Sequence, residues 1–285
     1  MHDDGAFAAQ STVTTPTTPK RPKFLSTQIS GRRIMGLVVI AILIGFVLLF
    51  GEARWLRRTD VTVEGLTTLR VLHISDIHFK GDVKYLQQVV DRINEERVDL
   101  VCHTGDLVEQ ARYLDAALAM LEQIRHPVYA VPGNHEHWSG VDLKRFDTAL
   151  RKTRGRLLVN QSIKVAKGYS LVGIDSITAG NPNVDQAISG TEGTRLIFIF
   201  HEPLIVQLLK GRPFALALAG HSHGGQVRIP LYGAPILPSH VGEYDRGLYK
   251  TPDGPLFVSS GIGTWMINAR FLCRPEIVLL HGAIR

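Results

Sequence analysis

The chain has 285 residues, enough for one large domain or two small ones. With 45% hydrophobic residues it is too apolar to be disordered throughout. Its formal net charge of +6 is spread along the chain rather than blocked, and much of it lies near the amino terminus beside an apolar segment. This pattern favours a membrane surface over nucleic acid as a partner, and two cysteines indicate no disulfide framework.

The amino-terminal part predicts a tail and an anchor. Residues 1–33 are rich in Thr, Ser, Pro and Ala without periodicity and predict a disordered tail. The uncharged run 34–50 predicts a transmembrane helix of about 25 Å, short for a span. A signal-peptide core is the alternative, but no small-x-small cleavage site follows the run. Because more basic residues precede the run than follow it, we expect a single-pass protein whose main domain lies on the outer, extracytoplasmic side.

A linker is expected over residues 51–68, and a globular domain over 69–285. Strands over 69–75, 98–103 and 128–131 alternate with helices over 83–96 and 114–124, an order that predicts a sheet covered by helices. After Gly155 shorter runs predict a second, more antiparallel sheet packed on the first, making an α/β fold. The strands expected there are 157–160, 162–165, 170–174, 195–200, 215–219, 226–229 and 256–259, and the helices are 141–151 and 203–209.

Metal-binding residue types follow five of these expected strands. They are Asp76 and His78, Asp106, Asn134, His201, and finally His221 and His223. Pairs at alternate positions point the same way along an extended strand end. Because ligands bind at the carboxyl ends of strands in open α/β sheets, we expect these side chains to converge.

Such a set holds more donors than one tetrahedral metal needs, and it suits two metals with a carboxylate between them. Two metals about 3.5–4 Å apart clamp a phosphoryl group and acidify a water, which suits in-line hydrolysis of a phosphate ester or diphosphate. Mixed oxygen and nitrogen ligands favour Mn, Fe or Zn over Ca or Mg. Taken singly, an Asp or His at a strand end is more often a cap or a surface residue, as His73 and His103 illustrate.

Three other classes of function are weighed against this one. Residues Gly220 to Gly224 spell Gly-x-Ser-x-Gly, the nucleophile elbow of serine hydrolases, but a turn and strand are expected after it where an elbow needs a helix. A membrane-tethered metal-binding scaffold would be expected to have lost ligands, and none is lost. A nucleotide switch is disfavoured because no Gly-x-x-x-x-Gly-Lys-Ser/Thr loop is present.

These motifs resemble the signature of the calcineurin-like metallophosphoesterases, over roughly residue 69 to the carboxyl end. The matching motifs are Asp76-x-His78, Gly105-Asp106-x-x-Glu109, Gly133-Asn134-His135-Glu136, His201 and Gly220-His221-Ser222-His223. The extension Gly224-Gly225-Gln226 is similar to a membrane-associated or exported bacterial subgroup. That subgroup includes the YkuE and YaeI types and a UDP-2,3-diacylglucosamine pyrophosphatase of lipid A synthesis.

The resemblance implies two central β-sheets flanked by helices and two bound divalent metals. One metal would be held by Asp76, His78, Asp106 and His223. The other would be held by Asp106, Asn134, His201 and His221, with Asp106 bridging. It also implies that His135 sits beside the metals as the catalytic residue that steadies the transition state or protonates the leaving oxygen.

The substrate is constrained least by the sequence. Arg228, Arg270 and Arg274 are candidates to bind a phosphate, with surface salt bridges as the alternative. The candidates to accept an acyl chain, with core packing as the alternative, are Trp138, Trp265, Met266 and Phe271. An anchored domain favours a lipid-linked phosphate or diphosphate, and nucleic acid is not expected. Hydrolysis of UDP-2,3-diacylglucosamine is the alternative, and it would require the active site on the cytoplasmic side.

Overall fold

The computed structural model describes residues 31–283, and the fold below is that of residues 43–283, which belong to one unit by their internal contacts. Residues 1–30 of the predicted tail lie outside the described residues. Helix α1 (Gly31–Gly51) contains the apolar run predicted as an anchor. Among the helices of the described part of the chain, none combines the length and hydropathy that a membrane crossing requires.

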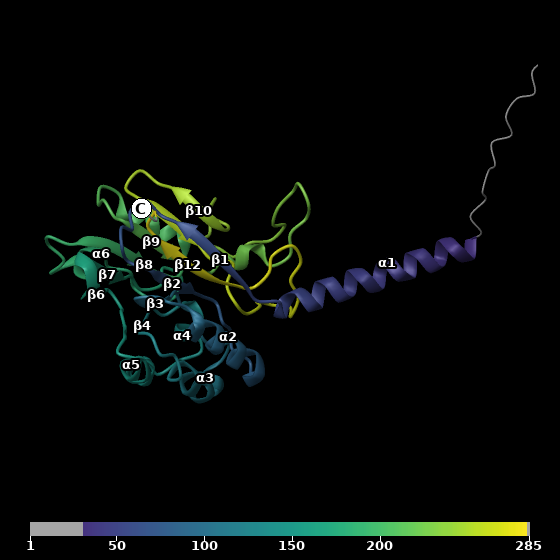
Figure 1. Ribbon diagram of the computed structural model, residues 1–285, viewed down its shortest axis with the longest axis horizontal. Helices are drawn as coiled ribbons and strands as arrows, with labels where there is room; N and C mark the ends of the chain where they lie inside the picture. The colour runs from purple at the N-terminus through teal and green to yellow at the C-terminus, as the bar shows by residue number, and fades with distance from the viewer. Residues whose placement is uncertain (1–30, 284–285) are drawn as a thin grey trace, which may run out of the picture. The chain divides into compact units, whose positions relative to one another are not determined.

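The first sheet has six strands in the order β1-β12-β2-β3-β4-β5 (Figure 1). Every neighbouring pair is parallel except β12 with β2. The strands are β1 (Arg57–Thr62), β12 (Glu276–His281), β2 (Val71–Ile74), β3 (Leu100–His103), β4 (Val128–Ala130) and β5 (Arg156–Leu157). Strands β2, β3 and β4 are buried along their whole length, which is why they read as continuous apolar runs.

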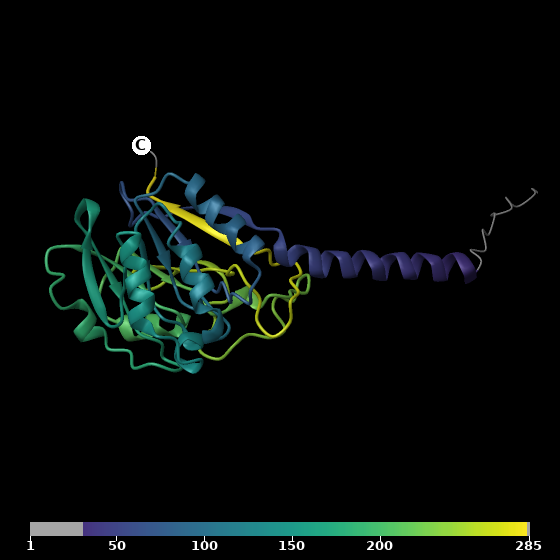
Figure 2. The same cartoon turned by 90° about the horizontal axis from the view of Figure 1, so that it is seen from below.

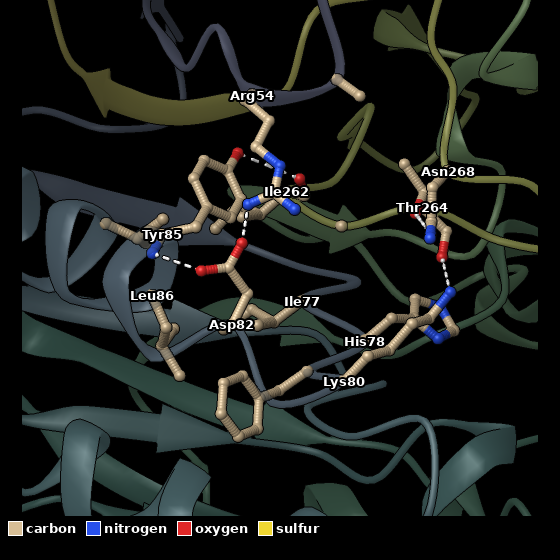
Figure 3. Close-up of a pocket in the computed structure, with 14 residues that line it drawn as sticks. Arg54, Ile77, His78, Lys80, Asp82, Tyr85, Leu86, Ile262, Thr264 and Asn268 are labelled. Carbon is tan, nitrogen blue, oxygen red and sulfur yellow. Dashed lines mark hydrogen bonds and ion pairs between the residues drawn. The ribbon is translucent and has the colours of Figure 1, made fainter. Parts of the chain in front are cut away.

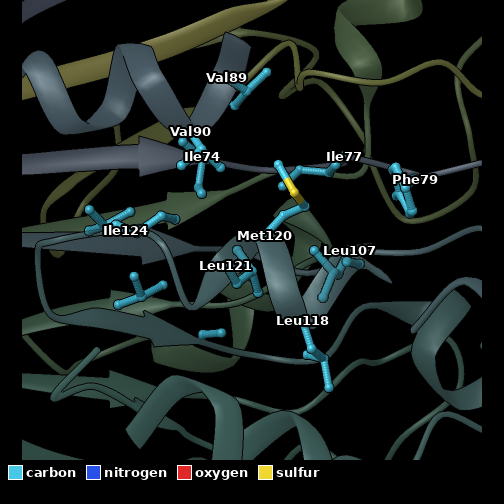
Figure 4. Packing of buried hydrophobic residues seen from close by; sticks show 14 of the residues in the cluster. Ile74, Ile77, Phe79, Val89, Val90, Leu107, Leu118, Met120, Leu121 and Ile124 are labelled. Carbon is cyan, nitrogen blue, oxygen red and sulfur yellow. The ribbon is translucent and has the colours of Figure 1, made fainter. Parts of the chain in front are cut away.

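Helices α2 (Val83–Glu95), α3 (Leu114–Leu121) and α5 (Leu143–Lys152) cover the outer face of this sheet. Apolar side chains at helical spacing on α2 and α3 pack against strand residues such as Ile74, as Figure 4 shows. Asp82 and Asp142 cap α2 and α5 by accepting hydrogen bonds from backbone N–H groups of their first turns. The predicted helices are therefore confirmed, with ends that shift by a few residues.

The second sheet also has six strands, in the order β10-β11-β9-β8-β7-β6. They are β10 (Gly247–Lys250), β11 (Pro255–Val258), β9 (Leu216–Ala219), β8 (Arg195–Ile199), β7 (Tyr169–Gly173) and β6 (Gln161–Val165). Only the two edge pairs are antiparallel, and the inner pairs are parallel. The second sheet is thus mixed and has two antiparallel pairs against one in the first, as expected, while short chain segments that contain α6 (Val184–Ile188) and the 3₁₀ helix Pro203–Leu209 serve as crossovers between its parallel strands.

The two sheets pack face to face with one hydrophobic layer between them. Val71 and Cys102 of the first sheet meet Leu171, Ile199 and Leu218 of the second in that layer. A further cluster covers the other face of the second sheet with residues of α6 and the Pro203–Leu209 helix. The layers therefore run helix, sheet, sheet, helix, as the resemblance implied, and Figure 2 shows carboxyl-terminal β12 in yellow lying among the amino-terminal strands.

Four segments differ from prediction. Residues 51–68, predicted as a linker, contain β1, whose alternating polar sequence carries one apolar residue and therefore gives little strand signal. Residues 226–229, predicted as a strand, form only isolated bridges, because the segment instead hydrogen-bonds to the loop that contains Phe271. Strands β10 and β12 were not predicted.

Candidate metal centre

The predicted ligands lie together where the two sheets meet. Asp76 and His78 follow β2, Asp106 follows β3 and Asn134 follows β4, all in the first sheet. His201 follows β8, and His221 and His223 follow β9, in the second sheet. Because these strands are parallel within each sheet, their carboxyl ends open at the same edge. The structure brings the ligand atoms of six of these seven side chains, all but that of Asn134, into groups within 4.8 Å, and their role as metal ligands stays a prediction.

Most of these residues have an unusual backbone. The φ angles are 50° at Asp76, 43° at His78, 56° at Asp106, 66° at His221 and 51° at His223. Left-handed conformations are uncommon for residues other than glycine, and they persist where surrounding structure fixes them, often at functional sites. The strand ends therefore turn sharply, and each turn carries a ligand-type side chain into the site.

One group of donors consists of Asp76, His78 and His223, whose ligand atoms lie within 4.8 Å of one another. The Nε2 atoms of His78 and His223 are 3.1 Å apart, and Nε2 of His223 is 3.6 Å from Oδ1 of Asp76. All three side chains are buried. Such spacing is that of donors arranged around one cation.

A second group consists of Asp106, His201 and His221, again within 4.8 Å. Nε2 of His201 lies 3.2 Å from Oδ2 of Asp106 and 3.1 Å from Nδ1 of His221. The same Oδ2 of Asp106 lies 3.3 Å from Nε2 of His78, in the first group. Asp106 therefore stands between the two groups, where a bridging carboxylate is expected.

Hydrogen bonds fix which imidazole nitrogen faces the site. Nδ1 of His201 donates to the carbonyl oxygen of Thr104 at 2.6 Å, and Nε2 of His221 donates to that of Ser239 at 2.9 Å. Nδ1 of His78 pairs with the carboxylate of Glu109 at 2.9 Å. These outer partners leave the inward nitrogens as lone-pair donors, the arrangement typical of metal-bound histidines.

Two further features fit a pair of cations. Oδ1 of Asn134 is buried and has no hydrogen-bond partner within the described residues, as is expected of an oxygen that a metal would satisfy. Burial opposes the charged form of His78, yet hydrogen bonds to Asp106 and Glu109 raise its pKa to about 9. The pKa of His201 is likewise raised, against its burial, by Asp106. The carboxylates of the donor set therefore favour a positive charge within the site.

Two divalent cations in this site would polarise a phosphoryl oxygen and lower the pKa of a bound water. Their identity is not specified by the donors, which are oxygen and imidazole nitrogen in both groups. The family described below uses two divalent metals, in agreement with the prediction of a dinuclear cofactor.

His135 lies at the rim of this cluster. Its ring makes a T-shaped contact with that of His78 at 4.6 Å, and its side chain keeps 14% exposure. Its backbone N–H donates to Oδ1 of Asp106 at 2.9 Å, and Nδ1 is 3.8 Å from the Glu109 carboxylate. The side chain is therefore held beside both donor groups while it remains open to solvent.

Glu136 is a site residue to which the sequence reasoning assigned no role. Its buried carboxylate accepts backbone N–H groups of Gly133, Asp106 and Leu107, each at 2.8 Å. It thereby ties the loop after β3 to the loop after β4. Burial and the neighbouring Asp106 raise the pKa of Glu136, and the backbone donors oppose that shift. The signal available in the sequence was an acidic residue directly after the Asn-His pair.

Two glycines let these loops approach closely. Gly105 has φ +93°, and a Cβ there would lie 2.6 Å from the backbone nitrogen of Gly133 and 2.8 Å from Nδ1 of His201. A Cβ at Gly220 would collide with Ser75 and with the carboxylate of Asp76. No larger residue fits either position without moving a ligand.

Ser222 does not have the setting of a nucleophile. Its side chain is fully buried, its Oγ accepts the backbone N–H of Gly224 at 3.1 Å, and a short 3₁₀ turn follows in place of a helix. The residues therefore lack the elbow geometry of serine hydrolases.

The three arginines considered for phosphate binding are engaged elsewhere. Arg270 is fully buried, and its guanidinium donates to the carbonyl oxygens of Gly263, Ser260 and Cys273. Arg228 pairs with Asp245, and Arg274 stacks on the ring of Trp55. These residues fix loops rather than present a free guanidinium.

Two pockets border the His78–His223 pair. One, of about 240 Å³, adjoins His78 and carries the charged side chains Arg54, Lys80 and Asp82 (Figure 3). Lys80 donates to the carbonyl oxygen of Thr264 at 2.9 Å, and Arg54 pairs with Asp82. The other pocket adjoins His223 and is apolar. The metal centre is thus flanked by one pocket of mixed charged and apolar lining and by one apolar pocket.

The chain was compared with known proteins. The model of the calcineurin-like phosphoesterase family matches residues 69–225. Metallophosphoesterase YkuE of Bacillus subtilis is 28% identical over 258 residues, covering 81% of this chain and 88% of the relative. Phosphodiesterase YaeI of Escherichia coli is 29% identical, covering 74% and 81%. UDP-2,3-diacylglucosamine pyrophosphatase LpxG of Chlamydia trachomatis is 25% identical, covering 75% and 83%. The chain therefore belongs to the calcineurin-like phosphoesterases, a family of metal-dependent phosphohydrolases.

Proposed function

We propose that this protein hydrolyses a phosphate ester or diphosphate bond in a lipid-linked or membrane-proximal substrate. Two divalent metals would be held by Asp76, His78, Asp106 and His223 on one side, and by Asp106, Asn134, His201 and His221 on the other. One observation carries the proposal: Oδ2 of Asp106 lies within 3.3 Å of imidazole nitrogens from both donor groups. A carboxylate so placed would be shared by two cations and would set their separation.

His135 has the position of a proton donor in this reaction. Its ring touches His78 and reaches solvent, so a leaving oxygen entering from outside would meet it before the buried ligands. Nδ1 of His135 lies 3.8 Å from the Glu109 carboxylate, and the ring is thus flanked by Glu109 and His78. Fixing of the His135 backbone by Asp106 keeps this ring at a constant distance from the donor groups.

The test is metal content together with hydrolysis. Purified protein should contain about two equivalents of metal per chain after Mn²⁺, Fe²⁺ or Zn²⁺ is supplied, measured by plasma mass spectrometry. It should then hydrolyse bis-p-nitrophenyl phosphate and lose that activity with a chelator, while a serine-directed reagent has no effect. Absence of both metal and activity would overturn the proposal.

The membrane assignment rests on the run 34–50 and on exposed apolar side chains of α1, among them Met35, Leu37 and Leu43. The excess of basic residues before this run supports a domain on the outer side. A reporter active only outside the cytoplasm, fused after Arg285, tests the orientation. Membrane fractions of cells with and without residues 31–51 test the anchor.

A second candidate function is hydrolysis of UDP-2,3-diacylglucosamine. It is favoured by the printed activity of the chlamydial relatives, which match three quarters of this chain at 25% and 23% identity. Release of UMP from this substrate by the metal-loaded protein would support it. Because the reporter fusion also locates the active site, a domain outside the cytoplasm would contradict it.

A further inference from the structure

The apolar pocket next to His223 has a defined construction. Its volume is about 320 Å³, at the lower end of the range of small-molecule sites, roughly 300–1,000 Å³. Its wall begins with Ser222 and His223 of the metal centre. Apart from Gln226, the remaining side chains are apolar, and they include Val227, Ile236, Pro238, Trp265, Met266 and Ile267. The cavity therefore leads from a predicted metal ligand onto apolar surface.

Gln226 ties the outer wall of the pocket to the metal centre. Its buried carboxamide donates to the carbonyl oxygens of Trp265 and Ile267, both at 2.9 Å, and accepts the backbone N–H of Trp265 at 2.6 Å. Gln226 follows His223 by a single 3₁₀ turn. The loop that carries Trp265 and Met266 is thus fixed to the chain segment that positions His223.

Apolar side chains at the pocket rim are exposed to solvent. Met266 is 74% exposed and Ile236 is 64% exposed, and Met266 has a left-handed backbone with φ 56°. Such a conformation costs free energy and persists where surrounding structure holds it, and here Gln226 hydrogen-bonds to both neighbours of Met266, Trp265 and Ile267. Exposed apolar groups clustered around a cavity are typical of a site that binds an apolar ligand.

The same loop contacts the end of α1. The backbone N–H of Arg270 donates to the carbonyl oxygen of Leu49 at 2.9 Å, and the N–H groups of Leu272 and Cys273 donate to the Glu52 carboxylate at 2.8 Å. The loop at the pocket rim is therefore hydrogen-bonded to the chain segment Leu49 to Glu52, which directly follows most of the apolar run.

We propose that this pocket binds an acyl chain of the substrate, with its phosphoryl group at the metal centre and its polar part in the pocket beside His78. The proposal rests on the proposed function and names the substrate class: a phosphate or diphosphate joined to an acyl or alkyl tail. Charged side chains are present in the lining beside His78, where Lys80, Asp82 and Arg54 stand among apolar residues, whereas the lining beyond Gln226 is apolar.

The test uses alkylphosphonates, which the protein cannot hydrolyse, on the full metal-loaded chain. Butyl-, octyl- and dodecylphosphonate are compared below their micelle concentrations as inhibitors of bis-p-nitrophenyl phosphate hydrolysis. Because each buried methylene contributes up to about 0.8 kcal/mol, partial burial of the tail should lower the inhibition constant by at least about 10-fold from butyl to dodecyl. Dodecylphosphonate should also shift tryptophan emission to the blue, and Trp265→Phe should abolish that shift.

Matched variants locate the effect. In Ile236→Glu and Ile267→Glu the ratio of butyl to dodecyl inhibition constants should fall close to one. Leu248→Glu places the same charge at an exposed leucine of β10 that does not line the pocket, and it should keep the ratio. Equal inhibition by butyl and dodecyl in an active wild-type enzyme would overturn this inference and leave the proposed function standing. If the wild-type protein hydrolysed no substrate but dodecylphosphonate still shifted the emission of Trp265, the proposed function would be overturned and the inference about the pocket would stand.

Discussion

Nε2 of His78 and Nε2 of His223 lie 3.1 Å apart although the residues are separated by 145 positions in the chain. Each follows a strand of a different sheet, β2 for His78 and β9 for His223, and each ring is buried. Two buried imidazoles this close gain little from each other, and His78 lowers the pKa of His223 in addition to the effect of burial. A cation between them would remove this conflict, so metal should contribute to stability as well as to catalysis.

Metal should therefore raise the melting temperature. At a free metal concentration about 100 times its Kd, a single site stabilises the folded state by about 2.7 kcal/mol. For a domain of this size that is a rise of roughly 5–10 °C. Scanning calorimetry of chelator-treated protein with and without Zn²⁺ or Mn²⁺ measures it. An unchanged melting temperature in protein that has bound metal would contradict the coupling.

Asp106 and His135 should separate metal binding from proton transfer. Asp106→Asn keeps the size of the side chain but removes the charge shared by both donor groups, so we expect loss of metal and of nearly all turnover. His135→Ala should keep two metals while kcat falls by about 10²–10⁴, the usual contribution of a general acid. Metal content and kcat of both variants are compared with wild type. Equal metal loss in the two would contradict the assignment of His135.

The strand-end residues could be predicted because each adds its own signal, an apolar run that ends in Asp, Asn or His. Helices such as α2 and α5 were predictable from their spacing and Asp caps. The left-handed turns at Asp76 or His221 were not, since nothing local requires them and only the opposing loops impose them. β1 was missed because its polar face is satisfied by Glu276, a partner 219 residues away from Arg57.

Glu136 should be essential for the shape of the site rather than for the chemistry. Glu136→Gln replaces an acceptor of several backbone N–H groups by a side chain with one acceptor and one donor end. Leaving such donors unmatched costs about 1–3 kcal/mol, so the free energy of unfolding should fall by that amount. Urea denaturation measures it. Glu192→Gln, at an exposed position, is the control and should change stability by less than about 0.5 kcal/mol.

The His137–Asp175 pair should make stability depend on pH. Nε2 of His137 lies 2.7 Å from Oδ1 of Asp175, and this hydrogen bond raises the pKa of His137 above 6.5. Burial opposes the charged form of Asp175, yet His137 and backbone N–H groups lower the pKa of Asp175 below 3.8. The His137 contribution is fully present below pH 6.5 and is lost as pH rises through its raised pKa. The Asp175 contribution is present above pH 3.8 and is lost as pH falls through its lowered pKa.

The pair should therefore stabilise the fold most between pH 3.8 and pH 6.5. In His137→Gln the melting temperature should fall furthest below wild type in this window, and the two proteins should converge at alkaline pH. His240→Gln is the matched control, because Nδ1 of His240 pairs with the Thr178 hydroxyl and not with a carboxylate. Melting temperatures of wild type, His137→Gln and His240→Gln, measured from pH 4 to about 9, test this prediction. A constant difference between wild type and His137→Gln at every pH would show that the pair contributes through packing and not through charge.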